Sequence, residues 1–219
     1  MSLNGTIMKT AALLFLVFCS ATYTWYQVTH GENFMPWVIG GLVGALVLCL
    51  VTVFKKEWAA FTSPAYALCE GLFLGAVSAV FETRYPGLVL NAVGLTLSVL
   101  FVMLAVYRMG WLRASPRFVM GVVAATAGIA VFYLVSMVLS MFGIAPMMQS
   151  SSPLSIGFSV VVVGIAALNL ILDFAVIEEG IDRGAPLYME WYAAFSLVVT
   201  LIWIYVEILN LLRKLQSRN

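Results

Sequence analysis

The chain has 219 residues, of which 63% are hydrophobic and only 10% are charged. Its mean hydropathy is +1.04. Soluble globular domains are about 45–50% apolar and about 25% charged, so these values exclude a soluble domain and indicate an integral membrane protein. The formal net charge of +1 gives no sign of the basic surface that nucleic acid requires. The lipid bilayer is therefore an expected partner, and nucleic acid is not.

Seven apolar runs follow one another along the chain. A helix needs ~20 mostly apolar residues to cross the hydrocarbon core. The expected spans are residues 8–28, 34–54, 64–83, 88–107, 117–142, 153–177 and 188–212. The predicted fold is all-α: a polytopic seven-transmembrane-helix bundle, with residues 1–219 forming a single transmembrane domain.

Short joints containing glycine, proline and polar residues separate these runs. Prolines at or next to the first residue predict the starts of the third, fifth and sixth spans. These prolines are Pro64, Pro116 and Pro153. Joints are expected at His30-Gly31-Glu32-Asn33, Tyr85-Pro86-Gly87, Ala145-Pro146 and Ser150-Ser151-Ser152. Gly180 and Gly184-Ala185-Pro186 are expected to separate the last two spans. The spaced glycine pairs Gly40 with Gly44 and Gly71 with Gly75 are expected to let helices approach closely.

The distribution of lysine and arginine predicts the orientation, because these residues concentrate in cytoplasmic loops. Seven of them fall on the side of the amino terminus: Lys9, Lys55, Lys56, Arg108, Arg113, Arg117 and Arg183. Four fall on the opposite side: Arg84, Arg213, Lys214 and Arg218. We therefore expect a cytoplasmic amino terminus. An odd number of spans places the tail outside, although its three basic residues favour the cytoplasm.

Three acidic residues lie inside apolar runs, where charge is costly and indicates function by default. They are Glu70, Asp173 and Glu207. We estimate depth from the cytoplasmic face at a rise of ~1.5 Å per residue. Glu70 lies ~9 Å in, counted from Pro64, and Asp173 lies ~10 Å in, counted from Gly180. Glu207 lies ~30 Å along the seventh span, near the opposite face. Similar depths favour Glu70 over Glu207 as the partner of Asp173. The alternatives are a hydrogen-bonded structural Glu70 and a solvated Glu207 near the interface.

Two neighbouring carboxylates cannot both ionise cheaply, and they share a proton unless a cation lies between them. Such a pair suits calcium, which prefers oxygen ligands. We therefore treat Asp173 and Glu70 as hypothetical calcium ligands. Lys55 and Lys56, at the end of the second span, are candidates for a competing cation.

The remaining polar residues give weaker signals. Glu178, Glu179, Asp182 and Glu190 lie in or beside the sixth loop. They form either a solvated loop or an acidic mouth that attracts cations. Phosphate-binding loops, nucleophile elbows and paired metal-binding histidines do not occur in the sequence, and His30 is expected at the surface. We expect neither an enzyme nor a bound cofactor.

Several stretches resemble the Bax inhibitor family, also called the transmembrane Bax-inhibitor-motif family, and its bacterial branch in particular. They are Lys55-Lys56-Glu57-Trp58, Ser63-Pro64-Ala65-Tyr66-Ala67-Leu68-Cys69-Glu70-Gly71-Leu72-Phe73-Leu74-Gly75, Pro116-Arg117-Phe118, Ala167-Leu168-Asn169-Leu170-Ile171-Leu172-Asp173-Phe174, Glu178-Glu179-Gly180 and Tyr188-Met189-Glu190-Trp191-Tyr192-Ala193-Ala194-Phe195. The resemblance covers nearly the whole chain and is most specific around Glu70 and Asp173.

The resemblance implies a bundle with its last helix near the centre, and a calcium leak gated by pH. In the family the gate pairs acids on the sixth and seventh helices with a basic residue from the second. The sixth-helix acid corresponds to Asp173 and the basic residue to Lys55 or Lys56. The seventh-helix acid corresponds to Thr200, whereas Glu207 lies seven residues later on the same helix face. Either Glu70 then replaces the missing acid, or the leak is lost or gated in another way.

Two functions remain open at this point. The first is a pH-sensitive leak for calcium or another cation, controlled by Asp173 with Glu70 or Glu207. The second is a membrane-embedded regulator that binds and restrains a membrane protease or another stress factor, without transport. The resemblance also implies the bacterial inner membrane and a part in stress response.

Overall fold

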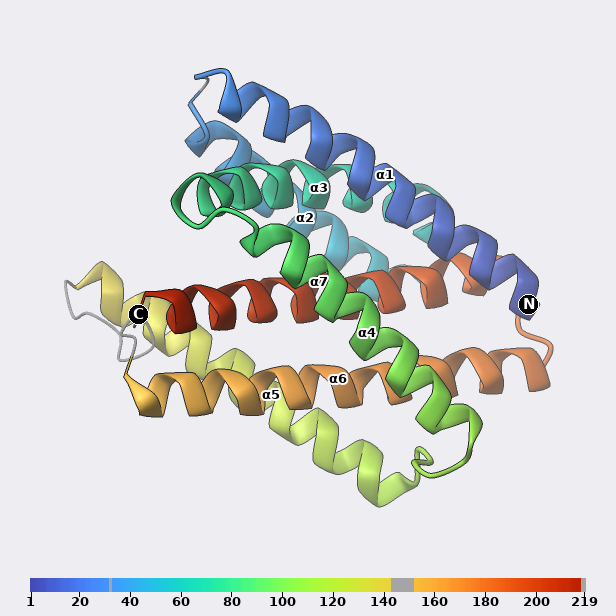
Figure 1. Ribbon diagram of the computed structural model, residues 1–219. Coiled ribbons are helices and arrows are strands. Elements are labelled where there is room, and N and C mark those ends of the chain that lie inside the picture. The colour runs from blue at the N-terminus through green and yellow to red at the C-terminus, as the bar shows by residue number, and fades with distance from the viewer. Residues whose placement is uncertain (32, 143–151, 218–219) are drawn as a thin grey trace. The chain divides into compact units, whose positions relative to one another are not determined.

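The computed structural model describes residues 1–31, 33–142 and 152–217, and these residues form helices joined by short turns (Figure 1). The helices are α1 (Leu3–Thr29), α2 (Met35–Phe54), the 3₁₀ helix η1 (Lys56–Trp58), α3 (Ala59–Arg84), α4 (Leu88–Arg108), α5 (Pro116–Met141), α6 (Pro153–Asp182) and α7 (Tyr188–Gln216). All seven α-helices are long and apolar enough to cross a membrane. The predicted all-α fold with seven spans is confirmed. The expected turn at Ala145-Pro146 and Ser150-Ser151, and the residues Glu32 and Arg218, lie outside the described part.

Helix ends follow from local sequence signals. Ser2 and Ser115 precede α1 and α5, and their side chains accept hydrogen bonds from the backbone N–H groups of Gly5 and Phe118. Pro116 and Pro153 are the first residues of their helices, as predicted. Gly184 follows α6 with φ +62°, a left-handed conformation that glycine adopts without a Cβ penalty.

Two boundaries differ from the prediction. The third span begins at Ala59, directly after η1, so Pro64 lies inside α3. A proline in a membrane helix is tolerated when other groups satisfy the freed carbonyl. The sixth helix continues through Gly180 to Asp182. Glu178, Glu179 and Asp182 are therefore helical residues and not loop residues.

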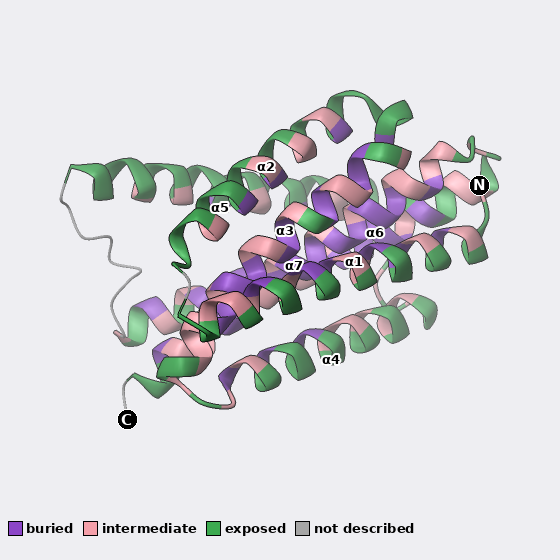
Figure 2. Ribbon diagram, turned by 90° about the horizontal axis from the view of Figure 1, so that it is seen from above, coloured by how far each residue is buried: buried purple, intermediate pink, exposed green. Residues whose placement is uncertain are grey.

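The chain divides into two units. The first contains residues 1–89 and 176–199, and the second contains residues 90–175 and 200–219. Both α6 and α7 run from one unit into the other as continuous helices. Among the seven spans, α7 has the largest buried share, 56% of its most apolar window, against 11% for α4 and for α5 (Figure 2). The central place expected for the last helix stays a prediction.

Close glycine contacts hold the first unit together, where α3 packs against both α1 and α2. A Cβ at Gly71 or Gly75 would come closer than 3.0 Å to backbone atoms of α1. A Cβ at Gly41 would come equally close to the backbone of α3, whereas one at Gly40 would meet nothing within 4 Å. The prediction was therefore right for Gly71 and Gly75. On α2 it was right for Gly44, where a Cβ would lie 3.0 Å from the Cys69 sulfur of α3, but Gly41 and not Gly40 approaches the α3 backbone.

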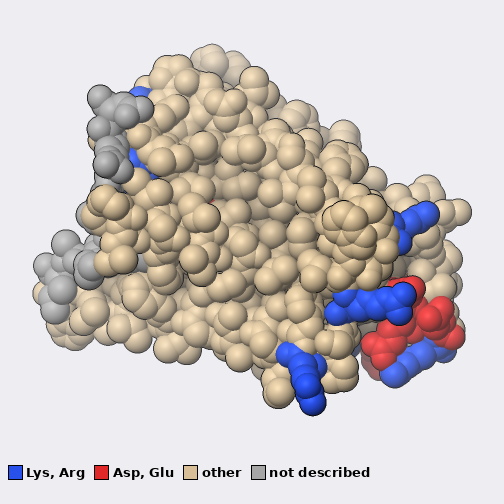
Figure 3. Space-filling view, turned by 60° about the horizontal axis from the view of Figure 1, so that its bottom comes forward, with Lys and Arg blue, Asp and Glu red and all other residues tan. Residues whose placement is uncertain are grey.

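The outer surfaces of the helices are apolar. Large side chains such as Phe54, Phe61 and Phe101 are exposed. Uncharged residues form most of the face shown in Figure 3. An apolar surface of this extent on long helices indicates direct contact with lipid.

Candidate functional site: buried carboxylates in the membrane spans

Glu70 is buried within the first unit, with a relative exposure of 8%. Because α3 begins at Ala59, Glu70 lies eleven residues into its helix, which is ~16 Å from the helix start at ~1.5 Å per residue, against the ~9 Å from Pro64 in the prediction. The hydroxyl of Tyr66, one turn earlier, donates a hydrogen bond to the Glu70 carboxylate. Tyr66 packs edge-on against Phe195 of α7, with ring centroids 5.0 Å apart. The hydrogen-bonded environment considered for Glu70 in the sequence analysis is therefore present.

Glu207 is also buried, with a relative exposure of 5%, so the alternative of a solvated side chain is wrong. Its carboxylate accepts hydrogen bonds from the Tyr133 hydroxyl of α5 at 2.6 Å and from the Trp203 indole at 3.3 Å. Lys214, seven residues further along α7, attracts it electrostatically. The second unit thus encloses an acid with two donors and a basic residue.

Lys214 was counted among the basic residues of the tail, and its relative exposure is only 3%. Its ammonium donates to the Ser159 hydroxyl at 2.8 Å and to the Ser155 carbonyl at 3.4 Å, both on α6. Residues seven apart face the same side of a helix. Thr200, Glu207 and Lys214 therefore form a polar stripe along α7, and all three are buried.

Asp173 lies on α6 in the second unit with a relative exposure of 6%. Phe174 beside it packs on Tyr107 of α4, with ring centroids 5.6 Å apart. Glu70 belongs to the first unit, so its predicted pairing with Asp173 stays a prediction. Within the described residues, no group of three or more His, Cys, Asp or Glu residues is arranged to hold a metal ion.

Lys55 and Lys56 are exposed and stack on aromatic rings. The Lys55 ammonium lies 4.5 Å from the centroid of Trp58, and that of Lys56 lies 4.9 Å from the centroid of Tyr192. These are cation–π distances. Both lysines belong to the first unit, whereas Asp173 belongs to the second. Their expected role as basic partners of Asp173 stays a prediction.

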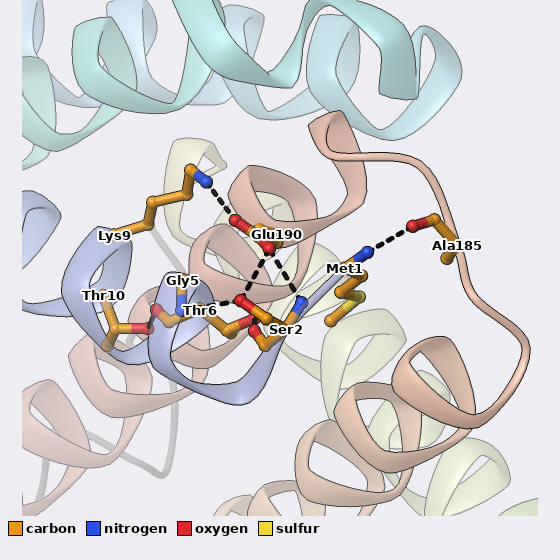
Figure 4. Close-up of polar contacts among 8 residues, drawn as sticks. All are labelled: Met1, Ser2, Gly5, Thr6, Lys9, Thr10, Ala185 and Glu190. Carbon is orange, nitrogen blue, oxygen red and sulfur yellow. Dashed lines mark hydrogen bonds and ion pairs between the residues drawn. The ribbon is translucent and has the colours of Figure 1, made fainter.

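Glu190 is the site residue that the sequence analysis undervalued (Figure 4). It was grouped with a solvated acidic loop, but its relative exposure is 2%. Its carboxylate forms an ion pair with Lys9 and accepts hydrogen bonds from the Ser2 N–H at 2.7 Å and the Ser2 hydroxyl at 3.1 Å. Gly5 leaves the space for this carboxylate, because a Cβ there would overlap it. The contacts tie the start of α1 to the start of α7 within the first unit.

A signal for this ion pair was present in the sequence. Lys9 falls inside the first expected span, and a charge inside an apolar run calls for a partner. The ammonium also lies 5.5 Å from the ring centroid of Trp191. Lys9 and Lys56 thus contact neighbouring residues of the first turns of α7, at the same end of the first unit. This agrees with their assignment to one side of the membrane.

A family model described as "Bax inhibitor 1 like" matches residues 1–217. The match includes all seven spans and every carboxylate described above. No curated protein and no solved structure matches the chain.

Proposed function

The chain belongs to the Bax inhibitor 1-like family, and on that premise we propose that it is a pH-sensitive leak for calcium or another cation. The observation that carries the proposal is the burial of three carboxylates in apolar spans: Glu70, Asp173 and Glu207. A carboxylate in the hydrocarbon core is costly, and such residues usually line ion or proton pathways. Burial also makes their charge depend strongly on the surroundings.

In the proposed mechanism, Asp173 and Glu207 change protonation state and thereby control the pathway. When Glu207 is ionised, a cation competes with Lys214 for it. When Glu207 is protonated, the Tyr133 and Trp203 contacts hold a neutral side chain and the attraction for a cation is lost. Lys214 is the basic partner of Glu207 in this mechanism, whereas Lys55 and Lys56 stay the predicted basic partners of Asp173. Glu70, which accepts a hydrogen bond from Tyr66, is a third protonatable acid and belongs to the first unit.

Calcium takes six to eight oxygen ligands in a tight protein site. The proposed leak needs only weak, transient coordination, and the described residues contain no group of three or more His, Cys, Asp or Glu side chains placed to hold a metal ion. Weak binding suits conduction, because an ion that is held tightly does not leave. The proposal is therefore a leak, and not a calcium-binding protein.

The test is calcium flux into proteoliposomes at pH 6, 7 and 8 for the wild type and for Asp173→Asn, Glu207→Gln and Glu70→Gln. We expect Asp173→Asn and Glu207→Gln to abolish the leak or its pH dependence. The matched control is Glu179→Gln, which removes an exposed acid that pairs with Arg183 at the end of α6 and should leave the flux unchanged. An unaltered pH profile in all three buried-acid variants would refute the mechanism. A wild type without flux that co-purifies with a membrane protease would favour the regulatory function instead.

A further inference from the structure

A pocket opens in the first unit where α2 ends, η1 follows and α7 begins. Its lining consists of Phe54, Lys55, Lys56, Glu57, Trp58 and Tyr188. The buried carboxylates described above do not line it. The pocket is therefore a candidate binding site distinct from the residues of the proposed leak.

Lys55 and Lys56 bring positive charge to this pocket without a carboxylate partner. The ion pairs found among the described residues join Lys9 to Glu190 and Arg183 to Glu179, and neither involves these two lysines. Both ammonium groups instead lie over aromatic rings. A cation–π contact uses one face of the ammonium, and a lysine has three N–H donors. Donors on both lysines thus remain for an anionic ligand.

The surroundings of the lysines match the boundary between hydrocarbon and headgroups. Phe54 ends a transmembrane helix, and its side chain is 82% exposed. Trp58, four residues later, is also exposed. Tryptophan and tyrosine concentrate at this boundary, where an apolar ring contacts acyl chains and a polar edge contacts water. A ligand in this pocket would therefore touch apolar and charged groups together.

We propose that the pocket binds the headgroup of an anionic phospholipid. The Lys55 and Lys56 ammonium groups donate to the phosphate oxygens, while Phe54 and Trp58 contact the acyl chains. Two lysines and Glu57 give the lining a net charge of +2 − 1 = +1, which matches the single negative charge of a phosphodiester. Basic pockets between transmembrane helices commonly bind anionic headgroups.

The exposed apolar side chains favour a lipid over a soluble phosphate. A soluble anion would use the lysines alone and leave the exposed apolar surfaces of Phe54 and Trp58 in water. A bilayer lipid also reaches the pocket sideways from the membrane, at a high local concentration. A lipid bound in this pocket would hold η1 in place between α2 and α3 and thereby make this end of the first unit more rigid.

The experiment measures the thermal unfolding midpoint of the full chain in detergent, with added phosphatidylglycerol or phosphatidylcholine. We expect phosphatidylglycerol to raise the midpoint of the wild type by about 5 °C near saturation, and phosphatidylcholine to have little effect. The double variant Lys55→Ala/Lys56→Ala should lose most of the shift. Glu57→Gln should increase it. The matched control Arg108→Ala/Arg113→Ala removes two exposed basic residues of the second unit and should retain it.

Two further measurements separate the possible outcomes. Native mass spectrometry should find a phosphatidylglycerol molecule retained on the wild type and the arginine control, but not on the double lysine variant. Glycerol phosphate, added in place of the lipid, should not raise the midpoint. An equal shift with glycerol phosphate, an equal shift with phosphatidylcholine, or full stabilisation of the double lysine variant would each overturn the proposal.

Discussion

The ion pair between Lys9 and Glu190 gives the sharpest test of the packing of the first unit. Glu190→Gln keeps an oxygen for the two Ser2 donors but removes the charge that Lys9 contacts. Removing one member of a buried ion pair costs about 3–5 kcal/mol. The Lys9 side chain is 20% exposed, and the glutamine keeps part of the hydrogen bonding. We therefore expect a loss of about 2 kcal/mol, which lowers the unfolding midpoint by about 4–8 °C for a chain of this length.

The loss of stability is measured from the unfolding midpoint, followed by tryptophan fluorescence during heating in detergent. A double-mutant cycle then gives the interaction energy between Lys9 and Glu190. Lys9→Met alone should also destabilise, because it leaves the Glu190 carboxylate buried without its cation. The double variant should lose less than the sum of the two single losses, by about 1 kcal/mol or more. The control is Glu179→Gln, which breaks the exposed pair with Arg183 and should cost less than about 1 kcal/mol. A Glu190→Gln variant as stable as this control, or strictly additive losses, would refute the reasoning.

Three other changes test separate parts of the structure by the same unfolding midpoint. Gly75→Leu should destabilise the protein by about 3 kcal/mol or more, because the side chain meets the backbone of α1, whereas Gly40→Leu, with nothing within 4 Å, should be tolerated. Tyr133→Phe should cost about 1–3 kcal/mol by removing the hydrogen bond to Glu207. Ser159→Ala should cost a similar amount, about 1–3 kcal/mol, because the buried Lys214 loses its hydroxyl partner, while the exposed Ser140→Ala should be neutral. A stable Gly75→Leu, Tyr133→Phe or Ser159→Ala protein would contradict the corresponding contact.

The existence of the seven helices could be predicted because each leaves a long apolar run in the sequence. Pro116 and Pro153 correctly predicted the starts of α5 and α6. Proline is favoured at the first position of a helix because the N–H group that it lacks has no partner within the helix there. The start of α3 was misplaced because Pro64 was taken to mark it, whereas the helix begins at Ala59, directly after η1, and contains this proline. The end of α6 was missed because its last two turns bear the charges of Glu178, Glu179 and Asp182.

Partners of the polar residues were harder to predict than the helices. Glu190 and Lys9 are 181 residues apart in the chain, and helix rotation, which sequence patterns did not fix, decides whether they meet. Lys214 was assigned to a tail because basic residues usually end a span, although its spacing of seven from Glu207 placed both on one face. Gly41 was overlooked beside Gly40, because glycines spaced four residues apart along a helix do not show which side of that helix faces its neighbour.

Calcium flux into proteoliposomes of the wild-type chain, compared with protein-free liposomes at pH 6, 7 and 8, tests the central claim most directly. The proposal predicts a protein-dependent leak whose rate changes across this range. A flux equal to that of the protein-free liposomes at every pH would contradict it.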